Sequence, residues 1–217
     1  MQRRNFVSGL GCAAALAASA TPAVLWAQTN TPKTGTDFIK LDKPVAVDAP
    51  AGKVEVIEFF WYNCPHCHAF EPALAAWLNK LPKDVAFKRV PIAFNDSFVP
   101  QQRLFYALEA MGQLDSLHAR VFKAIHSEKL QLTKAEAIVD WVVKQGVDKT
   151  KFLAQFNSFS ASTKATRAKQ LASAYQLEGV PAIGVAGRYY TDGSLAKSMD
   201  RALFVTDFLI DLARKGH

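Results

Sequence analysis

The sequence KVEVIEFFWYNCPHCHAF, residues 53–70, contains a strand pattern, a pair of cysteines and the start of a helix pattern in direct succession. Its first half is dense in β-branched and aromatic residues, which is typical of a buried central strand. Apolar residues at helix spacing then continue as far as residue 80. Cys64 and Cys67 therefore lie where a strand passes into a helix. Pro65 suits the first turn of that helix, where the N–H that proline lacks has no intrahelical partner in any case.

The patterns around this motif predict an α/β fold. Pro44 suits an edge strand, because it cannot donate a ladder hydrogen bond. Thr133 and Glu136 have the spacing of a capping box at the start of one predicted helix. The predicted elements are, in chain order, an extended segment at 38–47, strands at 53–61 and 85–94 separated by a helix at 63–80, helices in succession from about 99 to 178, strands at 180–187 and 188–191, and a closing amphipathic helix at 198–215.

Residues 1–27 predict a cleavable bacterial export signal. Arg3 and Arg4 form a basic start, and an uncharged, alanine-rich stretch follows as far as Ala27, after which we place the cleavage. A retained membrane anchor is the alternative, but the many alanines and glycines and Pro22 disfavour it. The run around the two arginines also resembles a twin-arginine signal, so both the Sec route and the twin-arginine route stay open.

Length and composition describe an ordinary globular chain. The 217 residues, half of them hydrophobic and 21% charged, are enough to bury a core without covalent staples. Loss of the two signal-sequence arginines reduces the formal charge from +7 to +5. The densest basic cluster is Lys164, Arg167 and Lys169, which we interpret as a solvated helix face and not as a nucleic-acid site.

The number of cysteines limits what the pair is for. Cleavage removes Cys12 and leaves only Cys64 and Cys67, in a compartment that permits disulfides. A structural zinc site needs four ligands, but no second pair exists, and His118 and His126 are not expected to share a helix face. A purely structural disulfide is also disfavoured, because a loop this short gains little from closure. The pattern therefore favours a reactive pair without a metal or another cofactor.

The position of the pair predicts how it reacts. A thiol reacts as the thiolate, and the N-terminus of a helix stabilises an anion on Cys64 through unpaired N–H groups and the helix dipole. His66 adds a donor or a positive charge, and Cys67 adds an S–H donor. We therefore expect Cys64 to be exposed, acidic and nucleophilic, and Cys67 to be the less accessible resolving thiol. A stabilised reduced form makes the disulfide a stronger oxidant.

Two stretches carry a resemblance to a known family. With EFFWYNCPHC at 58–67 and GVPAIGV at 179–185, the mature chain resembles the DsbA family of periplasmic thiol:disulfide oxidoreductases, within the thioredoxin superfamily. The resemblance implies a thioredoxin fold with an inserted helical domain. The implied thioredoxin-like domain comprises residues 28–97 and 171–217, and the implied insertion comprises 98–170.

The resemblance also implies roles for the residues of the pair. Cys64 matches the attacking cysteine of the family and Cys67 its buried partner. His66, in the intervening Pro65-His66 dipeptide, matches the histidine that gives the family its strong oxidising character.

Two features outside the pair match the family as well. Val180 and Pro181 match a loop that faces the disulfide and contains a cis proline. Glu58 matches an acidic residue buried near the cysteines, which would exchange protons with the resolving thiol. The basic partner of that acid falls on Lys88 or Arg89, and the sequence does not distinguish between them.

The implied function is oxidation of exported proteins. The pair would donate its disulfide to unfolded or partly folded proteins in the periplasm, and a quinone-linked membrane oxidase would reoxidise it. Apolar surface near Trp61, Tyr62 and Val180 is the expected client contact.

Two other functions stay open. An isomerase or reductase would use the same cysteines, but the isomerising relatives carry a substantial N-terminal dimerisation domain. Only about 25 residues lie between the signal sequence and the first central strand, which favours a monomeric oxidase. From a different class, the chain could be a chaperone or a metal-binding module with an incidental cysteine pair.

Overall fold

The computed structural model describes residues 31–216, so the predicted signal sequence and Cys12 lie outside the described residues. Within the described part, one five-stranded sheet has the order β1-β5-β4-β2-β3. The strands are β1 (Ile39–Lys40), β2 (Val54–Phe60), β3 (Val85–Pro91), β4 (Ala182–Val185) and β5 (Tyr189–Asp192). No helix in residues 31–216 is long and apolar enough to cross a membrane.

Strand β2 lies inside the sheet, as its composition predicts. It pairs in parallel with β3 and antiparallel with β4, and six of its seven residues are buried. At the opposite edge, β1 pairs with β5 over only two residues. The extended segment predicted for 38–47 is therefore mostly not a strand. Its later part is held by one backbone hydrogen bond, which Val45 donates to the carbonyl of Gly187.

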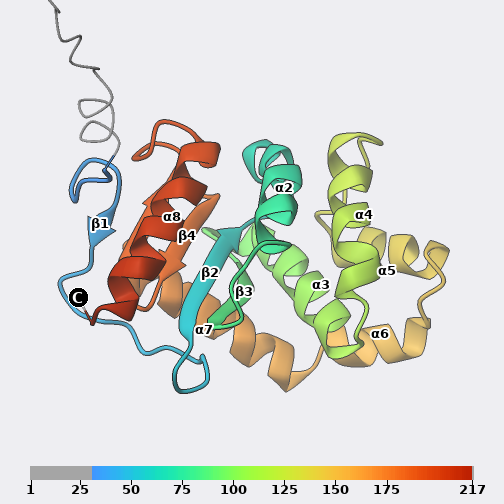
Figure 1. The fold of residues 1–217 in the computed structure, drawn as a ribbon. Helices are drawn as coiled ribbons and strands as arrows, with labels where there is room; N and C mark the ends of the chain where they lie inside the picture. Colours follow the sequence, from blue (N-terminus) through green and yellow to red (C-terminus); the bar gives the residue numbers. More distant parts are fainter. Residues whose placement is uncertain (1–30, 217) are drawn as a thin grey trace, which may run out of the picture. The chain divides into compact units, whose positions relative to one another are not determined.

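Helices cover both faces of the sheet. Neighbouring residues of β2 point to opposite sides, and apolar residues on both sides pack against helices. Val56 packs in one core with apolar residues of α2 (Pro65–Leu78) and α8 (Met199–Arg214). Ile57 packs in another core with residues of α7 (Phe159–Ala174). Figure 1 shows α8 and α7 on opposite sides of the strands.

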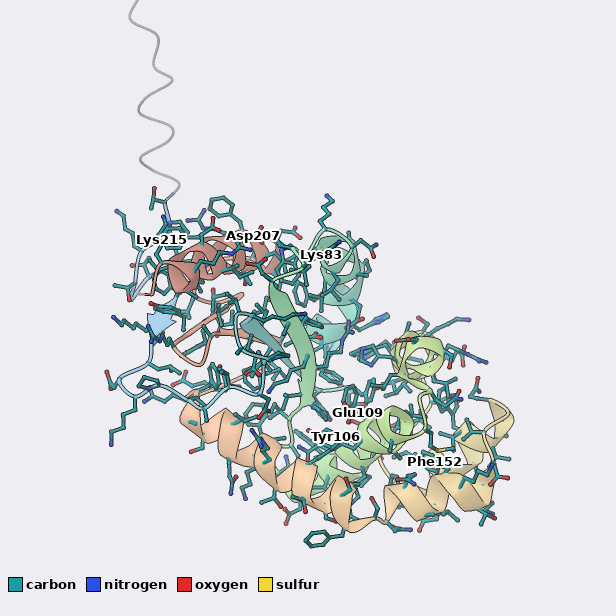
Figure 2. All side chains as sticks on the ribbon, turned by 60° about the horizontal axis from the view of Figure 1, so that its bottom comes forward. Lys83, Tyr106, Glu109, Phe152, Asp207 and Lys215 are labelled. Carbon is teal, nitrogen blue, oxygen red and sulfur yellow. The ribbon has the colours of Figure 1, made fainter. Side chains whose placement is uncertain are left out.

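A block of helices follows β3, as predicted. It contains a short 3₁₀ helix at Asp96–Phe98, α3 (Val99–Ala110), α4 (Leu114–His126), α5 (Ala135–Lys144) and α6 (Lys149–Phe156). Lys164 of α7 binds this block: its ammonium lies 2.7 Å from the Glu109 carboxylate and 5.7 Å from the centre of the Tyr106 ring. Figure 2 labels both of these α3 residues. The core of the block also includes Cys64 and Cys67, so the helices pack directly against the cysteine segment.

One predicted helix start is wrong. Helix α5 begins at Ala135 with Lys134 as its N-cap and no capping side chain, so Thr133 and Glu136 form no capping box there. Ser158 and Ser198 do cap α7 and α8, by accepting hydrogen bonds from backbone N–H groups. Spacing alone predicts the cap incorrectly because the preceding loop decides which residue enters the first turn.

Gly184 makes a testable contribution to the packing of β4. A Cβ atom there would lie 2.5 Å from Cε1 of Tyr175 and 3.1 Å from Cε2 of Phe59, and both rings are fully buried. We expect Gly184→Ala to lower the free energy of unfolding in urea by about 1–3 kcal/mol, as overpacking does. Gly179→Ala is the matched control, because a Cβ there meets nothing within 4 Å. Equal losses in both variants would refute this packing argument.

Candidate active site

Cys64 lies at the start of helix α2, where the sequence places it. It is the N-cap residue in an extended conformation, and Pro65 follows in the first turn. The Cys64 carbonyl accepts a hydrogen bond from the N–H of His68, which begins the helical ladder. Only 7% of Cys64 is exposed, so the expectation that it lies open to solvent is wrong. Cys67 is 0% exposed, which confirms that it is the less accessible of the two.

The surroundings of Cys64 favour its thiolate. The hydrogen bond from the Cys67 thiol is the largest cause that lowers the pKa of Cys64, to about 6. The backbone N–H groups of Cys67 and His66 and the charge of His66 also lower the pKa, while burial opposes the shift. The direction of this shift agrees with the prediction from the helix start.

Cys67 has the opposite electrostatic environment. Burial raises the pKa of its thiol far above the ordinary range, and the nearby Cys64 and Glu58 raise it further. Cys67 therefore stays protonated while Cys64 ionises. Both thiols are free in the structure. The two thiols of one motif thus differ strongly in acidity, which is the arrangement of a nucleophile and a protonated partner.

The loop before β4 faces the cysteine pair. The Val180-Pro181 peptide bond is cis, as the resemblance implies. The sulfur of Cys64 lies 3.4 Å from the carbonyl oxygen of Val180, and in its protonated form the thiol donates to that oxygen. The structure therefore brings together two motifs that are 116 residues apart.

Glu58 is paired with Arg89. The carboxyl group is 0% exposed, and Nε of Arg89 donates to its Oε2 at 2.8 Å. The parallel register of β2 and β3 places the two residues opposite each other. Lys88 points to the other face, where its ammonium lies 2.9 Å from Glu55. The register thus resolves the choice between Lys88 and Arg89.

The surroundings of Glu58 favour its protonated form. Burial is the largest cause and raises its pKa to about 8, with a further increase from Glu71, while Arg89 lowers it. Its Oε1 has no hydrogen-bond partner among the described residues, so a negative charge on that atom would be poorly satisfied. A negative charge on Glu58 raises the pKa of the Cys67 thiol, so the acid lies close to that thiol.

Glu71, His118 and Tyr62 also join this group, and the sequence does not predict this role for any of them. Glu71 accepts a hydrogen bond from Nη2 of Arg89 at 3.3 Å, and its second oxygen lies 3.4 Å from Nε2 of His118. Nδ1 of His118 lies 2.8 Å from the hydroxyl of Tyr62. Glu71 lies one helical turn after Cys67, and this spacing is the only feature of the sequence that indicates its place near the site. The contact with α4 depends on tertiary packing.

Two predictions about these side chains are wrong. Tyr62 is 1% exposed and so offers no client contact. His118 and His126 do share one side of α4, because His126 binds the backbone carbonyl of Tyr62 at 2.8 Å while His118 binds its hydroxyl. In residues 31–216, no three His, Cys, Asp or Glu side chains are grouped so that they could hold a metal ion.

A groove opens beside the cysteine pair. Its volume is about 650 Å³, and it extends from the cysteine motif past the cis-proline loop to β5. The residues that line it include His66, Glu178, Val180, Pro181, Tyr190 and Asp192. Trp61, in contrast, is partly buried and stacks on Phe98, with 3.7 Å between the ring centres. Of the three residues predicted for client contact, only Val180 lines the groove.

An acidic thiol at a helix N-terminus, with a buried partner one turn later, exchanges disulfides with other thiols. The class of protein is therefore a thiol:disulfide oxidoreductase. Residues 55–203 match the family model described as a DSBA-like thioredoxin domain, and the chain belongs to this family. It is a DsbA-like disulfide oxidoreductase with a thioredoxin-like α/β fold and inserted helices.

Named relatives cover nearly all of the chain. The thiol:disulfide interchange protein DsbA of Burkholderia cepacia is 44% identical over 201 residues, which are 93% of this chain and 91% of that protein. The crystal structure of Pseudomonas aeruginosa DsbA has a TM-score of 0.79 and 42% identity, and covers 84% of this chain and 94% of that one. The oxidoreductase DsbA of Xylella fastidiosa has a TM-score of 0.78 and 31% identity, and the match covers 85% of this chain and 98% of that one.

Proposed function

We propose that this protein oxidises the thiols of exported proteins by transferring its Cys64–Cys67 disulfide to them. The difference in acidity between the two thiols carries this proposal. A pKa of about 6 for Cys64 favours the reduced form at neutral pH, and a disulfide whose reduced form is stabilised is readily given away. The name shared by the relatives, thiol:disulfide interchange protein, supports the same reaction class.

Disulfide transfer needs two exchanges. In the first, a client thiolate attacks the sulfur of Cys64, a client–Cys64 disulfide forms, and Cys67 leaves with the bonding electron pair. Glu58 then gives its proton to the Cys67 thiolate and becomes a carboxylate that faces Arg89. In the second, another client thiolate attacks the client sulfur of the mixed disulfide, and Cys64 leaves as the stabilised thiolate. The client gains a disulfide, and the enzyme is released with both cysteines reduced.

Client proteins bind in the groove beside Pro181 in this proposal. Its wall includes Val180, Pro181 and the β5 residues Tyr190 and Asp192, a mixture of apolar and polar groups that suits an extended client segment. A quinone-linked membrane oxidase similar to DsbB then restores the disulfide.

The cellular setting follows from the same proposal. The protein works in the periplasm as a monomer after removal of residues 1–27. We assign residues 28–97 and 171–217 to the thioredoxin-like domain and residues 98–170 to the helical insertion. Helix α7 crosses the second boundary, so the two parts are joined by a continuous helix.

Oxidative refolding tests the direction of the reaction. The disulfide form should oxidise a reduced, unfolded protein with several cysteines within minutes, at equimolar amounts and without glutathione. The same enzyme in its dithiol form should rescue a scrambled version of that protein only weakly, because it has no strong tendency to reform its own disulfide. Fast rescue combined with slow oxidation would instead identify an isomerase.

A further inference from the structure

One guanidinium group binds two carboxyl groups, of which Glu58 is fully buried and Glu71 is partly buried. Arg89 donates through Nε to Glu58 and through Nη2 to Glu71, over 2.8 Å and 3.3 Å. One positive charge compensates only one negative charge, so one of the two carboxyl groups holds a proton at neutral pH. Which carboxyl group is protonated matters, because a negative charge on Glu58 raises the pKa of Cys67.

The two carboxyl groups differ in their remaining partners. Oε1 of Glu58 has no hydrogen-bond partner among residues 31–216. Oε1 of Glu71 lies 3.4 Å from Nε2 of His118. A carboxylate can only accept hydrogen bonds, so Nε2 of His118 carries the hydrogen. Nδ1 of the neutral ring is then an acceptor, and the hydroxyl of Tyr62, 2.8 Å away, donates to it.

We propose that His118 determines which of the two carboxyl groups keeps the shared proton: by donating to Glu71 it holds that group ionised and leaves Glu58 as the neutral acid. His118 is thus a positioning residue for the transfer of a proton to Cys67. It also connects the inserted helical block to the cysteine pair, because it is a residue of α4. This inference rests on the proposed function only where it assigns that proton to Cys67.

The charges around the two carboxyl groups agree with this assignment. Burial raises the pKa of Glu71, but the hydrogen bond from His118, together with Arg89, holds that pKa below its usual value. The Glu71 charge in turn contributes to the raised pKa of Glu58. Burial and Arg89 lower the pKa of His118 itself, so its ring is neutral. The cavity beside His118 also has Lys88, Glu109 and Asp115 on its walls.

Loss of the His118 donor should transfer the negative charge to Glu58. Without that hydrogen bond the pKa of Glu71 rises, its charge at neutral pH falls, and Arg89 pairs fully with Glu58. The pKa of Glu58 then drops. His118→Phe removes the donor but keeps an aromatic ring among Phe60, Phe105 and Phe122, whose ring centres lie 5.3–6.1 Å from that of His118.

Carboxyl carbon NMR on ¹³C-glutamate-labelled, reduced protein measures both titrations directly, with Glu58→Gln and Glu71→Gln used for assignment. The wild type should show Glu58 near pH 8 and Glu71 below its ordinary range. In His118→Phe the Glu58 midpoint should fall by about one pH unit or more while the Glu71 midpoint rises. His118→Gln keeps an N–H donor and should retain the wild-type order.

Two comparisons make the result decisive. His126→Gln removes the other histidine on the same side of α4, which contacts Tyr62 but has no bond to Glu71, and should leave both midpoints in the wild-type order. Unchanged midpoints in His118→Phe would overturn the inference, as would equal shifts in the phenylalanine and glutamine variants. If the wild type fails to oxidise clients, the proposed function fails while the carboxyl titrations still decide the role of His118.

Discussion

Replacing Cys64 by serine is expected to abolish disulfide transfer, to below about one thousandth of the wild-type rate. Serine cannot form the disulfide that is donated, and no other cysteine lies at the helix start. The fold should survive, because Cys64 is the N-cap of α2 and its side chain makes no capping bond, whereas serine is a preferred N-cap residue. The loss would therefore be chemical and not structural.

Cys67→Ala provides the matched comparison. It removes the resolving thiol without placing an unsatisfied hydroxyl at a fully buried position. The variant keeps the reactive Cys64, so a client that carries an activated disulfide should become covalently trapped on it, while turnover stops. Trapping is measured on non-reducing gels beside the refolding assay. Substantial turnover by the Cys64→Ser variant would show that the activity resides elsewhere.

The reduced protein should become more stable relative to the oxidised protein as the pH rises from about 6 to 9. The folded pKa of Cys64 is about 6, against 9.0 for an ordinary thiol, so the folded reduced state binds fewer protons than the unfolded one in this range. The lowered pKa of Cys64 stabilises the folded reduced protein, and this stabilisation is at its full size once the pH exceeds the pKa of the unfolded state. The stabilisation is lost as the pH falls through the pKa of the folded state. The oxidised protein has no such thiolate.

The size of this effect has an upper limit. The shift in the pKa of Cys64 from 9.0 to about 6 corresponds to about 4 kcal/mol of stabilisation of the folded reduced protein. Screening by solvent reduces this stabilisation to about 2 kcal/mol. Urea unfolding of both redox forms at pH 5.5, 7 and 9 gives the difference directly. Cys64→Ser is the control: it has a single redox form and lacks the titrating thiol, so its stability should not rise with pH in this way. A difference between the redox forms that stays constant with pH would contradict the role given to the Cys64 thiolate.

The sequence predicts the parts of the site that depend on local order. Cys64, Pro65 and Cys67 lie within one strand-to-helix junction, so their arrangement follows from chain connectivity and helix geometry. The order of strands and helices is predictable for the same reason, since each pattern is local. The exposure of Cys64 is not predictable from local order, because the loop at Val180, 116 residues away in the sequence, covers its sulfur.

Other parts of the site depend on pairing and packing. The partner of Glu58 follows only from the register of β2 and β3, because a shift of one residue would replace Arg89 by Lys88. The contacts of His118 depend on how α4 packs against α2, which no local spacing reveals. The burial of Tyr62 is unpredictable for the same reason, because it depends on α4, where His118 binds its hydroxyl.

In the proposed mechanism, the environment of Cys64 makes this disulfide an oxidant. Equilibration of the protein with mixtures of reduced and oxidised glutathione, followed by alkylation and mass measurement, gives its reduction potential. We expect a reduction potential more oxidising than that of protein disulfide isomerase, which is about −180 mV, because the Cys64 thiolate stabilises the reduced form. A reduction potential near that of thioredoxin, about −270 mV, would contradict the proposed oxidase function, since the cysteine pair would then remove disulfides and not donate them.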